Sequence, residues 1–455
     1  MSNAMPEDAI ASHPPHVPMR KVWHLAWPII LSNISVPLLG LIGTAAVGHL
    51  SNARYLGAVT LGTTLFDLLF WAFGFLRMGT TGLTSQAFGQ ESDDRLRRIL
   101  MQSLATACSL GILLIALSPL IIPLAIHLIG GSPSVQALAT QFAHIRIFSA
   151  PAVLANYVIL GWFLGQQHSR TTLLLVLVSN SINILLLLLL VLWMGLNSNG
   201  VAWASLASDY FTLLVGIVLI LRRSGQLSGK FAASMLKHLD DYLALFNVNK
   251  YLFIRTLCLL FVNTFFTSRG AVSGTTLLAA NAVLMEFLML TSYALDGFAQ
   301  SAEAMTGSAI GAKRFDQFGA AVRACARLSF WTALTASVLL LLGGPWLIDL
   351  LTSLKSVQDA AREYLPWMII MPLIAVWAYL MDGVFVGATA TKPMRDTLLL
   401  SLLVFLPIWY FTRSWGNNGL WFSFMMFTLV RSASLSGIYL KWRKGRWSST
   451  PARES

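Results

Sequence analysis

Long apolar stretches, separated by short polar connections, recur along the whole chain. A helix needs about 20 apolar residues to cross the hydrocarbon of a bilayer, and each stretch is near that length. No run of alternating apolar and polar residues is long enough for a transmembrane barrel, so the pattern predicts helices. The sequence therefore predicts an all-α integral membrane protein with twelve transmembrane helices. The twelve predicted spans are 24–48, 58–84, 99–127, 142–165, 171–195, 201–221, 245–267, 278–308, 321–348, 364–387, 397–413 and 419–440.

Composition and charge narrow the class further. Hydrophobic residues make up 56% and charged residues 11% of the 455 residues, whereas soluble domains carry about 25% charged residues. The net charge of +12 could suit a nucleic-acid-binding protein, but the basic residues concentrate at the two ends of the chain and in the even-numbered connections. This asymmetry predicts a multi-pass protein of the cell inner (plasma) membrane with both termini in the cytoplasm, and no nucleic-acid partner.

The chain repeats itself at an offset of about 222 residues, which we call the repeat offset. Each repeat holds six helices. Because this number is even, the two halves have parallel topology and form two pseudo-symmetric bundles. Duplicated multi-helix halves are typical of a transporter whose site lies between the halves. The repeated motifs are Ser134-Val135-Gln136 with Ser356-Val357-Gln358, and Gly161-x-x-x-Gly165 with Gly383-x-x-x-Gly387.

The expected domains follow from the repeat. Residues 23–221 form an N-lobe with helices 1 to 6, and residues 245–441 form a C-lobe with helices 7 to 12. A polar, basic linker at 222–244 joins them in the cytoplasm. Cytoplasmic tails are expected at 1–22 and 442–455, and Ser2-Asn3-Ala4 is typical of the residues that an expression vector leaves behind.

Ionisable residues within the apolar stretches are the sharpest chemical signal. An acid at bilayer depth costs about 2.5–3.5 kcal/mol, so it needs a partner or a watery cavity. Asp296 and Glu303 are seven residues apart and share a helix face, with Glu286 close to the same stripe. We expect an aqueous, cation-attracting cavity here, unless the acids pair with Arg255 or Arg77 or lie at a helix end. The candidate cavity acids are Asp296, Glu303, Asp382, Asp67 and Glu286.

Other residue types carry less chemistry. Pro28 lies inside the first predicted helix, where a proline removes a backbone hydrogen bond and creates a candidate hinge. The three cysteines have no CxxC spacing, and we expect neither a metal nor another cofactor. No catalytic motif or phosphate-binding loop is present, and the histidines are isolated, so we expect a protein that is not an enzyme. Uphill transport would then depend on an ion gradient.

Several long motifs resemble a known family. WPIILSNISVPLLGLIGTAAVGHLS in helix 1, FLRMGTTGLTSQAFGQ after helix 2, YALDGFAQSAEAMTGSAIGAKR in helix 8 and DGVFVGATATKPMRDT after helix 10 are similar to the multidrug and toxic compound extrusion (MATE) family, in particular its DNA-damage-inducible protein F branch. The similarity runs from about residue 20 to 445. It implies two six-helix bundles arranged as a V, alternating access, and export of drug-like organic cations in exchange for H⁺ or Na⁺. We expect a monomer in the lipid bilayer.

The sequence departs from that family at its coupling acids. Gly43 stands where the branch typically has an aspartate in helix 1, and Leu187 stands where helix 5 has the acid of an Asn-Ile-x-x-Asp motif. The resemblance also implies that Pro28 is the bending proline. We therefore expect weak or absent proton coupling through the N-lobe, with coupling carried by the C-lobe acids. The family positions that the N-lobe keeps are Asn180, Asn183 and Ser205. The alternative is a flippase for lipid-linked or other amphiphilic substrates with related architecture, which would require clustered arginines in a groove between the lobes.

Overall fold

The computed structural model describes residues 17–48 and 53–444. All regular structure in this part of the chain is helical. The first half contains α1 (Met19–Gly48), α2 (Ala53–Ala72), α3 (Phe75–Gly89), α4 (Asp93–Ile129), α5 (Pro133–Arg146), α6 (Ala150–Gly165), α7 (Ser169–Leu187), which continues as a π-helical turn (Leu188–Trp193), and α8 (Asn197–Ser224). The second half contains α9 (Leu239–Val272), α10 (Thr275–Gly311), α11 (Phe315–Leu351), α12 (Lys355–Gly387), α13 (Thr391–Thr412) and α14 (Asn417–Lys444).

The predicted spans all fall on helical segments, with two corrections. The span predicted at 58–84 is interrupted between α2 and α3, where Phe73 and Gly74 form a turn. The span predicted at 142–165 is likewise divided, because a short 3₁₀ segment at Ile147–Ser149 separates α5 from α6. Eleven helical segments of the described residues are long and apolar enough to cross a membrane. The last helix, α14, is not among them, because Arg431 and several serines lower its hydropathy.

The repeat seen in the sequence is present in the backbone. Glu91 and Lys313 have φ angles of 54° and 57°, and Gln167 and Thr389 have φ angles of 62° and 54°. The members of each pair are separated by the repeat offset, and a left-handed backbone is uncommon for residues other than glycine. In all four turns the left-handed residue donates its backbone N–H to the third carbonyl before it, at 2.8 to 3.1 Å. The two halves therefore end equivalent helices in the same way.

The two glycine pairs of the repeat bring helices together within each half. A side chain at Gly161 would collide with the backbone of Arg77 in α3, and one at Gly383 would collide with the backbone of Ala299 in α10. Arg77 and Ala299 are themselves separated by the repeat offset. The same close approach thus packs α6 on α3 and α12 on α10.

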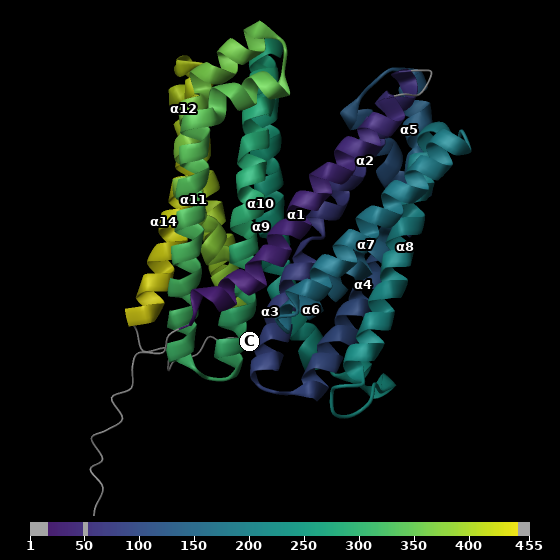
Figure 1. The fold of residues 1–455 in the computed structure, drawn as a ribbon, viewed down its shortest axis with the longest axis vertical. Helices are drawn as coiled ribbons and strands as arrows, with labels where there is room; N and C mark the ends of the chain where they lie inside the picture. The colour runs from purple at the N-terminus through teal and green to yellow at the C-terminus, as the bar shows by residue number, and fades with distance from the viewer. Residues whose placement is uncertain (1–16, 49–52, 445–455) are drawn as a thin grey trace, which may run out of the picture.

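The two helical bundles form a V (Figure 1). Following the predicted domains, we call the bundle of α1 to α8 the N-lobe and that of α9 to α14 the C-lobe. The lobes meet at the end of the molecule where α1 begins and α14 ends, and they diverge toward the end where α5 and α12 begin (Figure 1). We call these the closed end and the open end.

Backbone contacts join the lobes at the closed end. Gly89 of α3 lies against the backbone of Ser308, and Gly311 of α10 lies against the backbone of Gln86. The two contacts are reciprocal, because the repeat offset relates the two glycines to each other and their two partners to each other. The Gln86 side chain also donates to the carbonyl of Gly387 and to the Thr389 hydroxyl, both at 3.1 Å.

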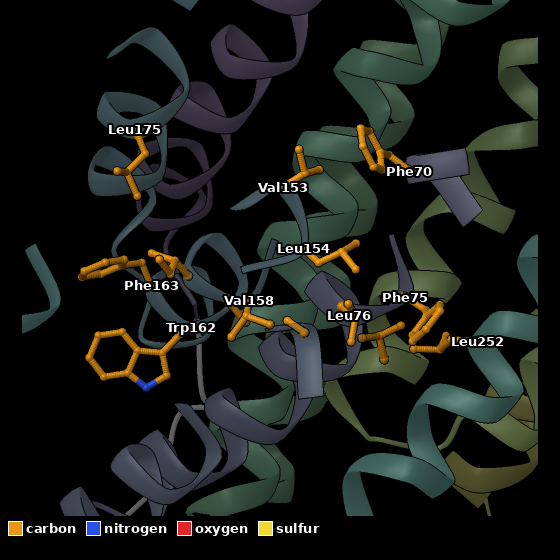
Figure 2. Close-up of a cluster of buried hydrophobic side chains, with 14 of the residues drawn as sticks. Phe70, Phe75, Leu76, Val153, Leu154, Val158, Trp162, Phe163, Leu175 and Leu252 are labelled. Atoms are coloured by element: carbon orange, nitrogen blue, oxygen red, sulfur yellow. The ribbon is translucent and has the colours of Figure 1, made fainter. Parts of the chain in front are cut away.

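The largest hydrophobic core extends across both lobes near the closed end. Figure 2 shows its centre, where Leu76 of α3 and Val158 of α6 lie among other buried side chains. Phe75 of α3 contacts Phe253 of α9 edge to face, with ring centroids 5.6 Å apart. Trp162 is fully buried, and its indole N–H donates to the Leu96 carbonyl at 2.9 Å. The lobes therefore share apolar packing where they meet.

Candidate transport site

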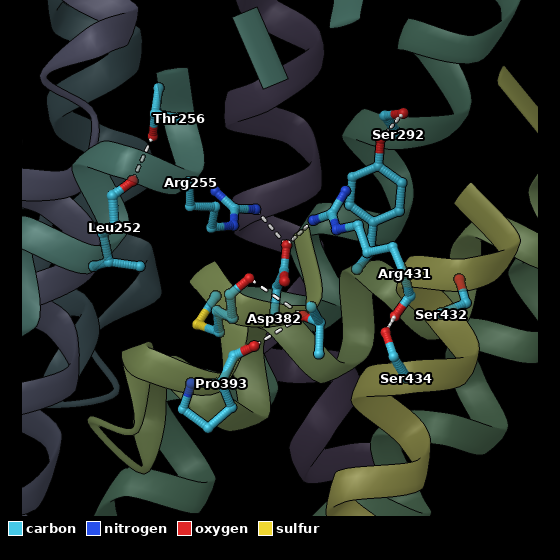
Figure 3. Close-up of polar contacts among 12 residues, drawn as sticks. Leu252, Arg255, Thr256, Ser292, Asp382, Pro393, Arg431, Ser432 and Ser434 are labelled. Atoms are coloured by element: carbon cyan, nitrogen blue, oxygen red, sulfur yellow. Dashed lines mark hydrogen bonds and ion pairs between the residues drawn. The ribbon is translucent and has the colours of Figure 1, made fainter. Parts of the chain in front are cut away.

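The clearest charged cluster lies inside the C-lobe. Asp382 of α12 accepts hydrogen bonds from Arg255 of α9 and from Arg431 of α14, and all three groups are at least largely buried (Figure 3). Asp382 is therefore ion-paired in this structure, which is the alternative that the sequence left open through Arg255. Next to it, the hydroxyls of Ser292 and Tyr379 are 2.6 Å apart and share a hydrogen bond. The cluster contains two guanidinium groups and one carboxylate, so it carries a net positive charge.

Glu303 of α10 lies where the lobes meet. Its side chain is 2% exposed, and Oε1 has no hydrogen-bond partner within the described residues. The opposite charge that acts most strongly on Glu303 is that of Arg77, which belongs to α3 of the other lobe. The Nη1 atom of Arg77 also has no hydrogen-bond partner within the described residues. Glu303 is therefore a buried carboxylate of the C-lobe on which a half-buried arginine of the N-lobe acts electrostatically.

The acids on α10 differ in exposure along one stripe. Glu286 is exposed, Asp296 is partly exposed, and Glu303 is buried. Asp296 accepts a hydrogen bond of 2.6 Å from the Gln300 side chain. The stripe therefore runs from the exposed Glu286 to the buried Glu303, which lies where the lobes meet.

Asp67 of α2 is the candidate acid of the N-lobe. Its side chain is exposed, and both Asp67 and Glu286 act electrostatically on the Tyr293 hydroxyl. An interaction of one tyrosine with acids from both lobes places these groups around a common region. The five candidate acids are thus divided into two exposed, one intermediate and two buried carboxylates.

The N-lobe positions identified from the family resemblance form hydrogen-bonded pairs. The Asn180 amide donates to the Ser35 hydroxyl at 2.8 Å, and the Asn183 amide donates to the Ser205 hydroxyl at 3.2 Å. Leu187 is 2% exposed and packs in the core. The surroundings of Gly43 lie outside the described residues. The structure therefore joins α1, α7 and α8 by neutral polar contacts.

Pro28 is buried in α1. Its own carbonyl accepts a hydrogen bond of 2.8 Å from the Ser32 hydroxyl, one turn later. The α1 helix is also tied to the C-lobe, because the Asn33 amide donates to the Tyr293 carbonyl at 3.2 Å. A change in the bend of α1 near Pro28 would therefore move the part of α1 that is hydrogen-bonded to α10.

The described residues contain no group of three or more His, Cys, Asp and Glu side chains arranged to hold a metal ion. Each buried carboxylate of the C-lobe instead has an arginine as its neighbour. An arginine beside a carboxylate stabilises its ionised form. The chemistry that the structure shows at these positions is thus ion pairing.

Comparison with known proteins agrees with this arrangement. The MatE family model matches residues 28–189 and 251–411, which is more than half of the chain. The chain belongs to the MatE family. It is 42% identical over 432 residues to DNA damage-inducible protein F of Escherichia coli (strain K12), with 94% of each chain covered. It is 24% identical to the probable multidrug resistance protein NorM of Acinetobacter baylyi, covering 96% of this chain and 98% of that one.

Solved structures of MatE proteins have the same fold. A structure described as the outward-facing conformation of a multidrug resistance MATE family transporter has a TM-score of 0.81 at 18% identity, covering 95% of this chain and 97% of that chain. The expected all-α membrane architecture and the family resemblance are both confirmed. As a member of the MatE family, the chain is a membrane transporter rather than an enzyme.

Two further charged residues of this MatE protein are not among the site residues predicted from the sequence. Arg431 was not singled out, although a lone arginine within an otherwise apolar span is a signal for a buried partner. Asp209 of α8 pairs with Arg146, whose guanidinium also lies over the Phe70 ring at 5.3 Å. The repeat offset relates Asp209 to Arg431, so equivalent positions of the two lobes carry opposite charges.

Proposed function

We propose that this protein is an inner-membrane efflux antiporter that exports drug-like, amphiphilic organic cations in exchange for protons. Support comes from relatives that are named multidrug resistance proteins and that align along nearly the whole chain. Both lobes belong to one chain, so a monomer would suffice. We also propose that both termini are cytoplasmic, because the basic connections at Arg95, Arg98, Lys313 and Arg314 lie at the closed end. The structure would then be open toward the outside.

The coupling proposal rests on the burial of the Glu303 carboxylate where the lobes meet. An ionised carboxylate that is buried without full hydrogen bonding is costly. That cost is removed when the carboxylate binds a proton, or when the lobes separate at this point and water reaches it. Proton binding therefore favours contact between the lobes at Glu303, and deprotonation favours separation. A group whose protonation depends on lobe position couples the proton gradient to alternating access.

The ligand geometry favours a proton over sodium. Arg77 and Arg255 both act on Glu303 and stabilise its ionised form, so they oppose the binding of either cation. A proton needs only one carboxylate oxygen, whereas a metal cation needs several ligands, and the described residues hold no cluster of three or more His, Cys, Asp and Glu side chains. The acids Asp67 and Glu286, which are exposed near the diverging part of the V, would attract cationic substrates to the region between the lobes.

A dye-efflux experiment tests this proposal. Cells that carry the unmodified chain should export a cationic dye in a manner that depends on the pH gradient, and Glu303→Gln should abolish that dependence. Glu363→Gln, which changes an exposed acid outside the lobe interface, is the control and should pump normally. If Glu303→Gln pumps with an unchanged response to pH, Glu303 is not the coupling group.

The N-lobe expectation has its own test. Because Gly43 and Leu187 cannot bind protons, introducing Gly43→Asp together with Leu187→Asp should change the coupling if the N-lobe can contribute. Efflux that is already maximal in the unmodified chain and insensitive to both substitutions would contradict the idea that N-lobe coupling is impaired. Measuring transport in vesicles with only a pH gradient, and then only a sodium gradient, identifies the ion.

The flippase alternative gains one observation from the structure. Arg255 and Arg431, which are far apart in the sequence, converge in the C-lobe. Both contact the same carboxylate of Asp382, which compensates one of their two charges. Because the cluster lies inside the C-lobe rather than in a groove between the lobes, we prefer the antiporter. Translocation of a fluorescent phospholipid in proteoliposomes, without export of cationic dyes, would favour the flippase instead.

A further inference from the structure

A polar cavity of about 1050 Å³ lies at the closed end. Both lobes form its wall, since it is lined by the ends of α3 and α8 from the N-lobe and by the end of α10 and the start of α11 from the C-lobe. It is separate from the acids of α10 and α2 described above. The charged residues in its wall are Lys21, Glu91, Asp93, Arg223, Lys313 and Arg314.

The cavity carries an excess of positive charge. One of its two acids, Asp93, already accepts hydrogen bonds from the Ser228 backbone N–H at 2.7 Å and the Ser228 hydroxyl at 2.8 Å. Arg97 and Arg223 also act on the Asp93 carboxylate. The Arg97 guanidinium is 1% exposed, and its Nε and Nη2 atoms have no partner within the described residues. Asp93 therefore does not compensate the charge of Lys21, Lys313 and Arg314.

The two equivalent turns around the cavity differ in chemistry. Glu91-Ser92 of the N-lobe corresponds, across the repeat offset, to Lys313-Arg314 of the C-lobe. Ser92 caps α4 by accepting a hydrogen bond from the Arg95 backbone N–H, whereas Arg314, at the equivalent position of α11, makes no side-chain cap. The C-lobe side of the cavity thus combines two basic side chains with an uncapped helix start, and both features favour an anion.

If these basic residues reflected only the general excess of positive charge on the cytoplasmic face, they would be spread over that surface. Here four of them converge on one open cavity that both lobes line. A phosphate group matches this environment, because it offers several acceptor oxygens and up to two negative charges. Basic pockets at the cytoplasmic ends of transmembrane helices are also known to accept lipid headgroups.

We propose that this cavity binds a phosphate-bearing anion through Lys21, Lys313 and Arg314, and that binding stabilises the conformation closed at this end. The lobes supply opposite walls, so the complete site exists only when they are together. A ligand that binds one of two conformations shifts the population toward it. The phosphate comes either from a lipid headgroup or from a soluble anion. The proposal is independent of substrate and coupling ion.

Binding is tested on the purified full-length protein by thermal unfolding. The probes are inorganic phosphate, with sodium chloride at equal ionic strength as reference, and short-chain phosphatidylglycerol, with short-chain phosphatidylcholine as reference. We expect one of the two probes to raise the unfolding temperature by about 5 °C near saturation. A response to inorganic phosphate alone identifies a soluble anion, and a response only to phosphatidylglycerol identifies a headgroup.

The double variant Lys313→Gln with Arg314→Gln identifies the site. Both side chains are exposed, so the unliganded protein should remain folded. The half-maximal ligand concentration should increase about 30-fold, which corresponds to about 1 kcal/mol for each basic side chain. Lys441→Gln with Arg443→Gln removes two exposed charges at the same end but outside the cavity, and should change little.

The conformational part is tested with spin labels at Asp94→Cys and Asp316→Cys, two exposed, equivalent positions in α4 and α11. The ligand should increase the short-distance population between the lobes. The proposal is overturned if neither probe stabilises the protein, if the two double variants respond alike, or if the ligand leaves the distances unchanged. None of these results depends on efflux, so they are distinguishable from failure of the proposed antiport.

Discussion

Replacing Gly311 by alanine should weaken the contact that closes the lobes at the closed end. The added methyl carbon would lie 2.8 Å from the carbonyl carbon and 2.9 Å from the Cα atom of Gln86. Carbon atoms in contact are normally about 3.5–4.0 Å apart, so α3 and α10 must separate by about 1 Å. The obstructing atoms belong to the backbone and cannot rotate away.

The expected size of the effect follows from that overlap. Overpacking a close contact typically costs about 1–3 kcal/mol. The cost applies only while the lobes are together here, so it lowers the population of the closed-end conformation relative to others about 5-fold to 150-fold. Gly89→Ala should act in the same way, because its methyl carbon would lie 2.7 Å from the carbonyl carbon of Ser308.

Distances between the spin-labelled positions 94 and 316 measure this change. We expect a larger long-distance population in Gly311→Ala and in Gly89→Ala than in the unmodified chain. Gly343→Ala and Gly437→Ala are matched controls, because a side chain at either helical position meets no atom within 4 Å. If the closed-end distances are the same in all four variants, the reciprocal glycine contacts do not hold the lobes together.

Three further predictions concern the stability of the protein in detergent, measured by thermal or denaturant unfolding. Asp382→Asn should destabilise the protein by about 3–5 kcal/mol, because two buried guanidinium groups lose their counter-charge. Adding Arg431→Met should recover part of this loss. If Asp382→Asn is as stable as the unmodified chain, the ion-pair assignment is wrong. Trp162→Ala should cost about 3–5 kcal/mol. Trp193→Ala should cost far less, because the Trp193 side chain is 83% exposed. Similar losses of stability in the two variants would contradict the described core. Asn180→Ala should cost about 1 kcal/mol through loss of its hydrogen bond to Ser35. The Ser35 hydroxyl also donates to the Ser32 carbonyl, so adding Ser35→Ala should cost more, but less than the sum of the two single losses.

The membrane fold could be predicted because hydrophobic length and repetition are local properties of the sequence. Each apolar stretch is long enough to specify a helix by itself, and the repeat offset relates the halves without any knowledge of their packing. The interruption at Gly74 was missed, since the apolar pattern continues across it and gives no sign of a break.

The site was only partly predictable, because burial depends on how the lobes meet. The helical period places Asp296 and Glu303 on one face, but it does not say that Glu286 is exposed while Glu303 is buried. Similarly, Asp382 and Arg431 are separated by a helix–turn–helix segment, and no short-range pattern pairs them. Tertiary packing therefore decides which acids are exposed and which are buried or ion-paired.

The opposite charges at Asp209 and Arg431 have a consequence for the two halves as separate molecules. Asp209 is paired with Arg146 inside the N-lobe, and Arg431 is paired with Asp382 inside the C-lobe. Neither charge therefore takes its counter-charge from the other lobe. Coexpressed fragments split within 225–238 should each retain their own buried ion pair and reassemble through the contact of α3 with α10.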